Sequence, residues 1–299
     1  MGFRIYRRQT RALIALIYNV LKLFFLDYLI NRLFLILVHT MESVILAAGF
    51  SSRFNFGDSS FKKFLLPLKK TIILNYVITG MYFAGIRKIN IVVDDAVDKS
   101  QVVSCFYDFG KEINLDFKDL KINLIENKYS ERENGYSLYL GAKAVSSKSF
   151  VLSMADHIFS ENIYAELLSN YNNDDIVLAT DPMSIKGIYD LEDCTKVYGE
   201  NFYIKKIGKQ ISNYNRLDMG VFIMKTDLVQ KTSRGIEKSR EKFGVSDIVI
   251  SAINENLKVS YFDFPNTIWV DVDNDFEYEK LKRNFEESNQ FKPFNLDIF

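Results

Sequence analysis

The sequence SVILAAGFSSR occupies residues 43–53, where an aliphatic run leads into a turn of small residues that ends on Arg53. The aliphatic run predicts a buried strand. Small side chains in the turn let the backbone approach a ligand closely, and successive N–H groups there can form a concave anion site. A second cation, Lys63, begins the sequence KFLLP. The spacing is neither Walker A nor GxGxxG, which argues against a P-loop NTPase and a Rossmann dehydrogenase.

The chain beyond Met41 alternates short β-rich runs with amphipathic stretches of helical length. This alternation is typical of a doubly wound α/β fold, and we expect a mixed, mostly parallel sheet. The expected strands are residues 43–47, 88–93, 121–126, 150–153 and 175–179, and the expected helices are residues 72–85, 101–109, 135–145 and 162–169. A β-hairpin at 193–198 and 202–207, an extended segment at 217–224, a helical stretch and a last strand near 268–272 follow. With four prolines and no low-complexity linker, we predict one domain at residues 41–299.

The composition excludes several classes of protein. Lys plus Arg and Asp plus Glu each number 38, so no overall field would draw the chain onto nucleic acid, and we expect no nucleic-acid partner. Cys105 and Cys194 stand far apart, which argues against a disulfide framework and a zinc site and favours a reducing, cytoplasmic location. The two histidines, His39 and His157, leave little for a Ser-His or His-metal mechanism. Carboxylates, lysines and backbone amides must therefore carry the chemistry.

Residues 1–40 form a hydrophobic N-terminal extension that we treat as separate from the domain. Residues 12–38 are mostly Leu, Ile and Phe, but Lys22 and Asp27 interrupt them before an 18-residue apolar run is reached. A central charge costs about 2.5 to 3.5 kcal/mol on insertion, which argues against a clean membrane span. Three interpretations stay open: a mis-assigned start upstream of Met41, a membrane-associating segment, or a helix packed on the domain or on a partner.

Two expected strands end on carboxylates. Asp156 closes the sequence SMAD, and Asp273 closes WVDVD. Ligands in open α/β sheets bind beyond the carboxyl ends of strands, so these two residues could hold one Mg²⁺ through hard oxygen ligands. Whether Asp271 or Asp273 is the inner ligand stays open. The Asp-Val-Asp triplet also fits the DxD motif of glycosyltransferases, but there the motif is expected mid-chain, where this sequence has Asp156.

The sequence ENGYSLYL at residues 133–140 begins an expected helix with polar residues. Asn134 and Ser137 offer side-chain hydrogen bonds, and Gly135 permits close approach of a ligand to the backbone. The alternative is an ordinary helix N-cap.

LAAGFSSR at 46–53, followed by KFLLP, resembles the signature LAAGxGxR of the sugar-phosphate nucleotidyltransferase superfamily and the MobA-like NTP transferases. Ser51 stands where that signature usually has its second glycine. Together with ENGYSLYL, the stretches MADH at 154–157, CTKV at 194–197, KKIGK at 205–209 and LDMGVF at 217–222 resemble CTP:inositol-1-phosphate cytidylyltransferases. This resemblance covers nearly all of the chain beyond Met41. Phosphocholine cytidylyltransferases are the nearest competitor.

The resemblance implies a GT-A/Rossmann-like nucleotidyltransferase fold with a β-hairpin on the acceptor side. It implies Mg²⁺-dependent transfer of CMP from CTP to inositol 1-phosphate, with release of pyrophosphate. The alternatives are a sugar-1-phosphate or phosphocholine acceptor, a glycosyltransferase, and an inactive nucleotide-binding module. The oligomeric state stays open.

The residues expected to do this work fall into four groups. The catalytic candidates are Arg53, Lys63, Asp156 and Asp273, and the metal ligands among them are Asp156 and Asp273. The nucleotide-binding candidates are Leu46, Ala47, Ala48, Gly49, Arg53, Lys63, Asn134, Gly135 and Ser137. The acceptor-binding candidates are Lys196 and Lys206 for phosphate and Asp218 for polyol hydroxyls.

Overall fold

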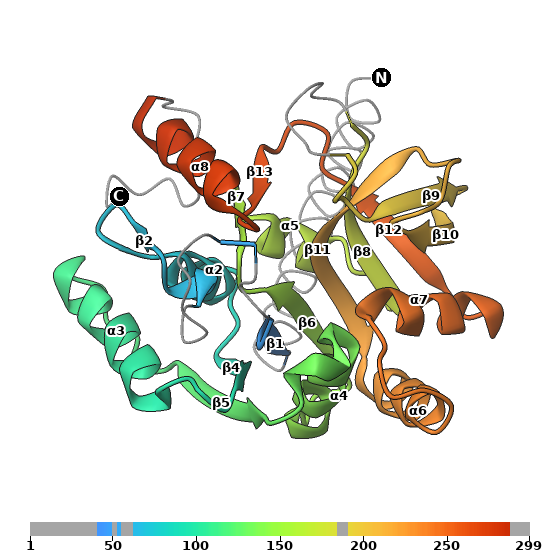
Figure 1. Cartoon of the computed structure of the whole chain (residues 1–299), viewed down its shortest axis with the longest axis horizontal. Helices are drawn as coiled ribbons and strands as arrows, with labels where there is room; N and C mark the ends of the chain where they lie inside the picture. Colours follow the sequence, from blue (N-terminus) through green and yellow to red (C-terminus); the bar gives the residue numbers. More distant parts are fainter. Residues whose placement is uncertain (1–40, 50–52, 55–61, 184–190, 288–299) are drawn as a thin grey trace, which may run out of the picture. The chain divides into compact units, whose positions relative to one another are not determined.

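The computed structural model describes residues 41–49, 53–54, 62–183 and 191–287 (Figure 1). These residues belong to one compact unit, Met41–Phe299. The extension at residues 1–40 and the substituted position Ser51 lie outside the described ranges. Among the described helices, none is both long and apolar enough to cross a membrane.

A nine-stranded sheet forms the centre of the described part, in the order β5-β4-β1-β6-β11-β8-β12-β10-β9. Its strands are β1 (Glu42–Ala47), β4 (Lys88–Asp94), β5 (Lys121–Asn127), β6 (Ser149–Met154), β8 (Ile176–Asp181), β9 (Lys196–Glu200), β10 (Tyr203–Gly208), β11 (Arg216–Lys225) and β12 (Val259–Asp263). Strands β5, β4, β1 and β6 run parallel, as do β8 and β12, whereas β11 is antiparallel to β6 and β8. The sheet is mixed, as expected, but it is mostly parallel only in its first four strands.

Helices cover both faces of the sheet. They are α2 (Ile73–Phe83), α3 (Lys99–Glu112), α4 (Asn134–Ala144), α5 (Ile163–Ser169), α6 (Thr226–Glu237), α7 (Val245–Asn254) and α8 (Asp275–Glu287), with 3-10 turns η1 (Lys63–Leu65) and η2 (Ser130–Arg132). Helices α4, α6 and α7 contact one another and share an apolar core with β1 and β6, while α2 and α3 lie on the other side of the sheet (Figure 1). All six residues of β1 are buried, as is usual for a parallel strand covered on both faces.

A second, smaller sheet brings two distant acidic segments together. Strand β7 (His157–Phe159) pairs antiparallel with β13 (Trp269–Asp271), and this register places Asp271 opposite His157. The N–H of Val272 donates to the carbonyl of Asp156 at 3.1 Å. Apolar residues of α2, β2 (Pro67–Leu68) and α8 pack around this pairing. The two chain segments that end on carboxylates are therefore fixed side by side.

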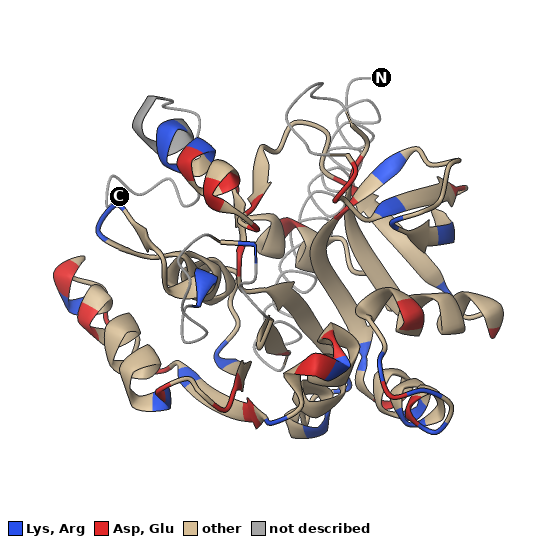
Figure 2. Ribbon diagram, viewed as in Figure 1, with Lys and Arg blue, Asp and Glu red and all other residues tan. Residues whose placement is uncertain are grey.

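The predicted hairpin is present as β9 and β10, but its turn lies slightly later than residues 199–201, the gap between the two expected strands. Asn201 and Phe202 form a two-residue connection with φ of 52° and 67°. Positive φ at both positions is the geometry that suits a tight antiparallel hairpin. Strands β7 and β12 were not expected from the sequence. Figure 2 shows Lys and Arg interspersed with Asp and Glu in this view.

Candidate active site

One cavity of about 740 Å³ lies at the carboxyl ends of β1 and β6. Its lining combines residues of the small-residue loop, the start of α4, the acidic segments and the hairpin half of the chain. Among the predicted site residues, those that line it are Leu46, Ala47, Ala48, Gly49, Arg53, Lys63, Asn134, Ser137, Asp156, Asp218 and Asp273. The position is the one expected for ligand binding in an α/β sheet.

Lys63 joins the two predicted metal-binding carboxylates. Its Nζ lies 2.5 Å from Oδ2 of Asp156 and donates a hydrogen bond to Oδ1 of Asp273. Arg53 approaches the other oxygen of Asp273, with Nη1 at 3.0 Å from Oδ2. Lys63 belongs to η1, Asp156 follows β6, and Asp273 follows β13. Three segments that are far apart in the sequence thus form a single charged centre.

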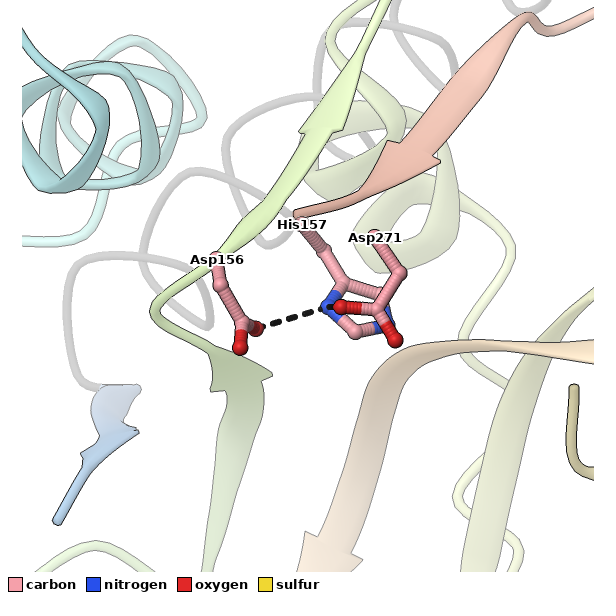
Figure 3. Close-up of side chains that lie close together, drawn as sticks. All are labelled: Asp156, His157 and Asp271. Atoms are coloured by element: carbon pink, nitrogen blue, oxygen red, sulfur yellow. Dashed lines mark hydrogen bonds and ion pairs between the residues drawn. The ribbon is translucent and has the colours of Figure 1, made fainter. Parts of the chain in front are cut away.

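His157 is a member of this centre that the sequence argument did not use. Its Nδ1 lies 2.9 Å from Oδ1 of Asp156 and 3.6 Å from Oδ1 of Asp271, and Figure 3 shows the three side chains converging. The ring stacks on Trp269 with centroids 5.9 Å apart, and Nε1 of Trp269 donates to Oδ2 of Asp181 at 3.0 Å. These contacts fix the orientation of the imidazole.

Gly220 on β11 makes room for the same imidazole. Its φ is +73°, a conformation that favours glycine, and a Cβ built there would lie 2.7 Å from Cδ2 of His157. Its N–H donates to Oδ1 of Asp218 at 2.7 Å. Burial raises the pKa of Asp218 to about 6, although that hydrogen bond and His157 act in the opposite direction.

The charges of the centre shift one another strongly. Burial alone would raise the pKa of Asp156, but Lys63 and His157 hold it well below its usual range. Burial would likewise lower the pKa of Lys63, but the surrounding carboxylates hold it well above its usual range. Burial raises the pKa of Asp271 to about 7, and the nearby carboxylates outweigh burial at His157 and raise its pKa to about 9. Lys63 and Asp156 are therefore both charged at neutral pH.

The donor set fits a divalent cation. Ligand atoms of Asp156, His157 and Asp271 lie within 4.8 Å of one another. Asp273, the other predicted ligand, has both oxygens engaged by Lys63 and Arg53. Asp156 belongs both to this cluster and to the predicted pair Asp156 and Asp273. Carboxylate oxygens are the ligands that hard cations prefer.

The polar residues at the start of α4 have partners within the protein. Oδ1 of Asn134 accepts from the N–H of Val245 at 2.9 Å, and the N–H of Gly135 donates to the carbonyl of Phe243 at 3.0 Å. The Ser137 hydroxyl accepts from Nδ2 of Asn127 at 2.9 Å. A Cβ on Gly135 would lie 2.5 Å from the same Phe243 carbonyl. The close approach that Gly135 permits is therefore to residues 243–244.

Arg132 reinforces this junction, which we call the α4 clamp, between residues 132–135 and 237–245. Its Nε donates to the carbonyl of Glu241 and its Nη2 to Oε1 of Glu237, both at 3.1 Å. Its guanidinium also lies 3.8 Å from the centroid of the Tyr136 ring. Asn134 of the clamp and the neighbouring residues 244–246 line the cavity. The clamp therefore shapes one wall of the site.

The lysines predicted for the acceptor do not line the cavity. Lys206 is exposed on β10, and Nζ of Lys196 donates to the carbonyl of Lys209 at 2.8 Å. Strand β9 pairs with β10 and β11. In this arrangement Lys209 lines the cavity. Asp193 also lines the cavity, and the sequence argument had selected neither of these two residues. The sequence argument chose the correct segment, KKIGK, but it chose Lys206 within it and not the last lysine, Lys209.

Comparison with known proteins finds a family match over the first part of the domain. Residues 43–186 match the MobA-like NTP transferase domain family. This match agrees with the resemblance to the MobA-like NTP transferases that the sequence motifs indicated. Solved structures similar to this chain include the inositol-1-phosphate CTP transferase from T. maritima, with a TM-score of 0.67 at 22% identity, covering 83% of this chain and 98% of that one. A putative glucose-1-phosphate thymidylyltransferase from Bacillus anthracis gives 0.69 at 18% identity, covering 85% and 100%. These two likenesses show a shared GT-A-like fold.

Two curated relatives carry the same name, "Bifunctional IPC transferase and DIPP synthase". The protein from Aquifex aeolicus is 26% identical over 242 residues, which cover 81% of this chain and 51% of that protein. The protein from Thermococcus kodakarensis is 27% identical over 242 residues, which cover 81% and 50%. The chain therefore spans about half the length of these relatives.

Proposed function

We propose that this chain transfers CMP from CTP to inositol 1-phosphate and releases pyrophosphate. The observation that carries the proposal is the Lys63 ammonium held by Asp156 and Asp273 in a cavity that residues 46–49 also line. A fixed cation beside a backbone anion site suits a reaction at phosphate. The names of the curated relatives and of the structural neighbour from T. maritima support the choice of CTP and inositol phosphate.

The reaction needs alignment and charge neutralisation more than it needs a base. A phosphate monoester has a second pKa of about 6, so the attacking oxygen is already mostly deprotonated at neutral pH. This oxygen bonds to the α-phosphorus of CTP, and the bond from that phosphorus to pyrophosphate breaks. Preorganised cations that face the charge developing in the transition state are the usual source of catalysis.

The described residues offer a partner for each part of the substrates. Lys63 would stabilise charge at the α-phosphate, and Arg53 would hold the departing pyrophosphate. Backbone N–H groups of residues 46–49 would contact the nucleotide, together with Asn134 and Ser137 at the α4 wall. Asp218, which is half-buried and lines the cavity, would accept hydrogen bonds from polyol hydroxyls.

We propose Mg²⁺ as the cofactor of this centre. Asp156 would hold it with a second carboxylate, either Asp273 or Asp271, and the proximity of hard oxygen donors supports this choice. Bound there, Mg²⁺ would neutralise phosphate charge. His157 would orient Asp156 through the hydrogen bond at its Nδ1.

A matrix of substrates tests the proposal. Purified protein would be mixed with Mg²⁺, each NTP, and inositol 1-phosphate, phosphocholine or a hexose 1-phosphate, and pyrophosphate release would be measured. We expect the highest kcat/KM for CTP with inositol 1-phosphate. A preference for another pair would reassign the substrates within the class. Transfer from a nucleotide sugar without pyrophosphate release would point instead to a glycosyltransferase.

A further inference from the structure

Asp193 joins two cations that reach the cavity from different parts of the chain. Its Oδ2 accepts a hydrogen bond from Nη1 of Arg53, and its Oδ1 lies 3.2 Å from Nζ of Lys209. All three residues line the cavity, and between 39% and 48% of each side chain is exposed. Ion pairs this exposed contribute at most about 1 kcal/mol. Stability alone therefore does not account for the cluster.

The backbone of Lys209 is held in place at the cavity wall. Lys209 directly follows β10, and its carbonyl accepts the hydrogen bond from Lys196 on the neighbouring strand β9. The ammonium of Lys196 also lies 5.8 Å from the centroid of the Tyr214 ring. Lys196 therefore holds the backbone of Lys209 and does not itself line the cavity. In contrast, Lys205 and Lys206 are exposed on β10 and do not line the cavity.

We infer that Lys209 binds the phosphate group of the acceptor and that Asp193 occupies Lys209 until this group arrives. The inference rests on the proposed function, because it assigns one end of the same site. A phosphate monoester dianion offers three strong acceptor oxygens and can displace a single carboxylate from an ammonium. Asp193 keeps its hydrogen bond with Arg53 when it gives up Lys209. It is therefore a positioning residue, and Lys209 is the binding residue.

The phosphate at Lys209 could in principle come from the acceptor or from the triphosphate. The loop at residues 46–49 and Lys63 already serve the triphosphate and come from the first part of the chain. Lys209 and Asp193 flank the hairpin, and Thr195 beside them also lines the cavity. Asp218, the candidate for polyol hydroxyls, lies on β11, which pairs with β9. This shared origin favours the acceptor.

Three variants test the inference in steady-state assays of the full chain with CTP and inositol 1-phosphate. Lys209→Met should raise the KM for the acceptor at least about tenfold, as expected for the loss of a charge-assisted hydrogen bond. The KM for CTP should stay nearly constant. Lys205→Met, which changes an exposed lysine on the adjoining strand β10, is the matched control. Asp193→Asn should lower the KM for the acceptor, because it removes the competing carboxylate.

The KM for the acceptor should rise in Lys209→Met and fall in Asp193→Asn. These opposite changes separate binding from support of the fold, since damage to the fold would raise this KM in both variants. A rise in the KM for CTP in Lys209→Met would assign this lysine to the triphosphate and overturn the inference. A fourth variant, Lys206→Met, changes the other exposed lysine of β10, and a larger effect of this variant on the KM for the acceptor would also overturn the inference.

The proposed function and this inference can fail separately. If another phosphate monoester is the acceptor, the same variants are measured with that ester. If no acceptor gives turnover, calorimetric titration with inositol 1-phosphate compares the wild type with Lys209→Met and Lys205→Met. Equal dissociation constants in all three proteins, or no binding to any of them, would then overturn the inference.

Discussion

At the level of single residues, Lys63 and its carboxylate partners form an electrostatic unit whose members depend on one another. Neutralising either Asp156 or Asp273 removes a charged ligand of the proposed Mg²⁺. It also removes one of the negative charges that balance the Lys63 ammonium. We therefore expect Asp156→Asn and Asp273→Asn each to lower kcat at least about a hundredfold with the fold intact. Turnover and thermal unfolding measured side by side check this.

Asp271→Asn is the matched control for these two variants. We expect its effect on kcat to be smaller, because Asp271 faces His157 across the β7–β13 pair. Near-normal turnover in both Asp156→Asn and Asp273→Asn would exclude the two-carboxylate site. A larger loss in Asp271→Asn than in Asp273→Asn would identify Asp271 as the inner ligand.

The charge of Lys63 should matter most when charge redistributes at the α-phosphate. We expect Lys63→Ala to lower kcat by a larger factor than it raises the dissociation constant of CTP, because a transition-state interaction acts mainly on rate. Arg53→Ala should weaken CTP binding as well, since Arg53 is assigned to the leaving pyrophosphate. Single-turnover rates and equilibrium titrations separate the two effects. Equal losses in Lys63→Ala would make this residue a simple phosphate anchor.

Glu42 gives the pH dependence of stability a specific source. Burial alone would raise its pKa, but hydrogen bonds from Ser146, Lys88 and Asn90 lower it below the usual 4.5. A carboxylate whose pKa is lower in the folded state stabilises the protein at pH values above its unfolded-state pKa. This stabilisation is lost as the pH falls through the folded-state pKa.

Glu42→Gln should therefore lower the free energy of unfolding at pH 7 by about 1 to 3 kcal/mol, the usual effect of losing a buried hydrogen-bond partner. The difference from the wild type should shrink as the pH falls below 4.5. Urea unfolding over a pH series checks this, with the exposed Glu112→Gln as control. A difference that is the same at every pH would show that the charge of Glu42 is unimportant.

At the level of elements, the α4 clamp decides where one wall of the cavity stands. Arg132 ties η2 to residues 237 and 241, so its loss should let the start of α4 and residues 243–246 move apart. We expect Arg132→Ala to raise the KM for CTP about tenfold while the KM for the acceptor changes less, because misplaced binding groups cost affinity and rate.

Arg240→Ala is the control for the clamp, because Arg240 pairs with Asp247 at 2.7 Å in the same connection but does not line the cavity. Steady-state kinetics with each substrate varied in turn give both KM values. Equal effects on the two substrates would show that the clamp supports the whole cavity rather than its nucleotide end.

The elements that the sequence predicted well are those with a local signal. The buried run before Ala47, the Asp98-capped helix α3 and the hairpin all have periodicity or turn residues of their own. Strand β12 was not expected, and its place between β8 and β10 comes from tertiary pairing.

The candidate site divides in the same way. Asp156, Asp273 and Lys63 follow motifs, and the structure brings them together. The partners of Asn134 and Gly135 lie more than a hundred residues later, at Val245 and Phe243, so no local pattern could reveal them. The choice of Lys209 over Lys206 depends on the placement of the hairpin, which sequence spacing does not encode.

For the molecule as a whole, every proposed site residue lies at or after Leu46. Deleting residues 1–40 should therefore leave the kcat and KM of nucleotidyl transfer unchanged. Assays of the full chain and of residues 41–299 in parallel check this, together with a comparison of their sedimentation with membranes. An inactive deletion variant would show that residues 1–40 support the domain. Mass spectrometry of the native N-terminus would show whether translation begins at Met41.

The insertion of β11 between β6 and β8 also orders events during synthesis. When β8 has left the ribosome, β6 still has an open edge, because its partner β11 ends only at Lys225. An unpaired edge in a partly folded sheet invites contact with other chains. Lys63 and Asp156 are then already made, but Asp271 and Asp273 are not. A nascent chain therefore has residues 46–49 well before its acidic centre, and we expect the proposed nucleotidyl transfer to begin only once β13, the last strand that the structure describes, has emerged.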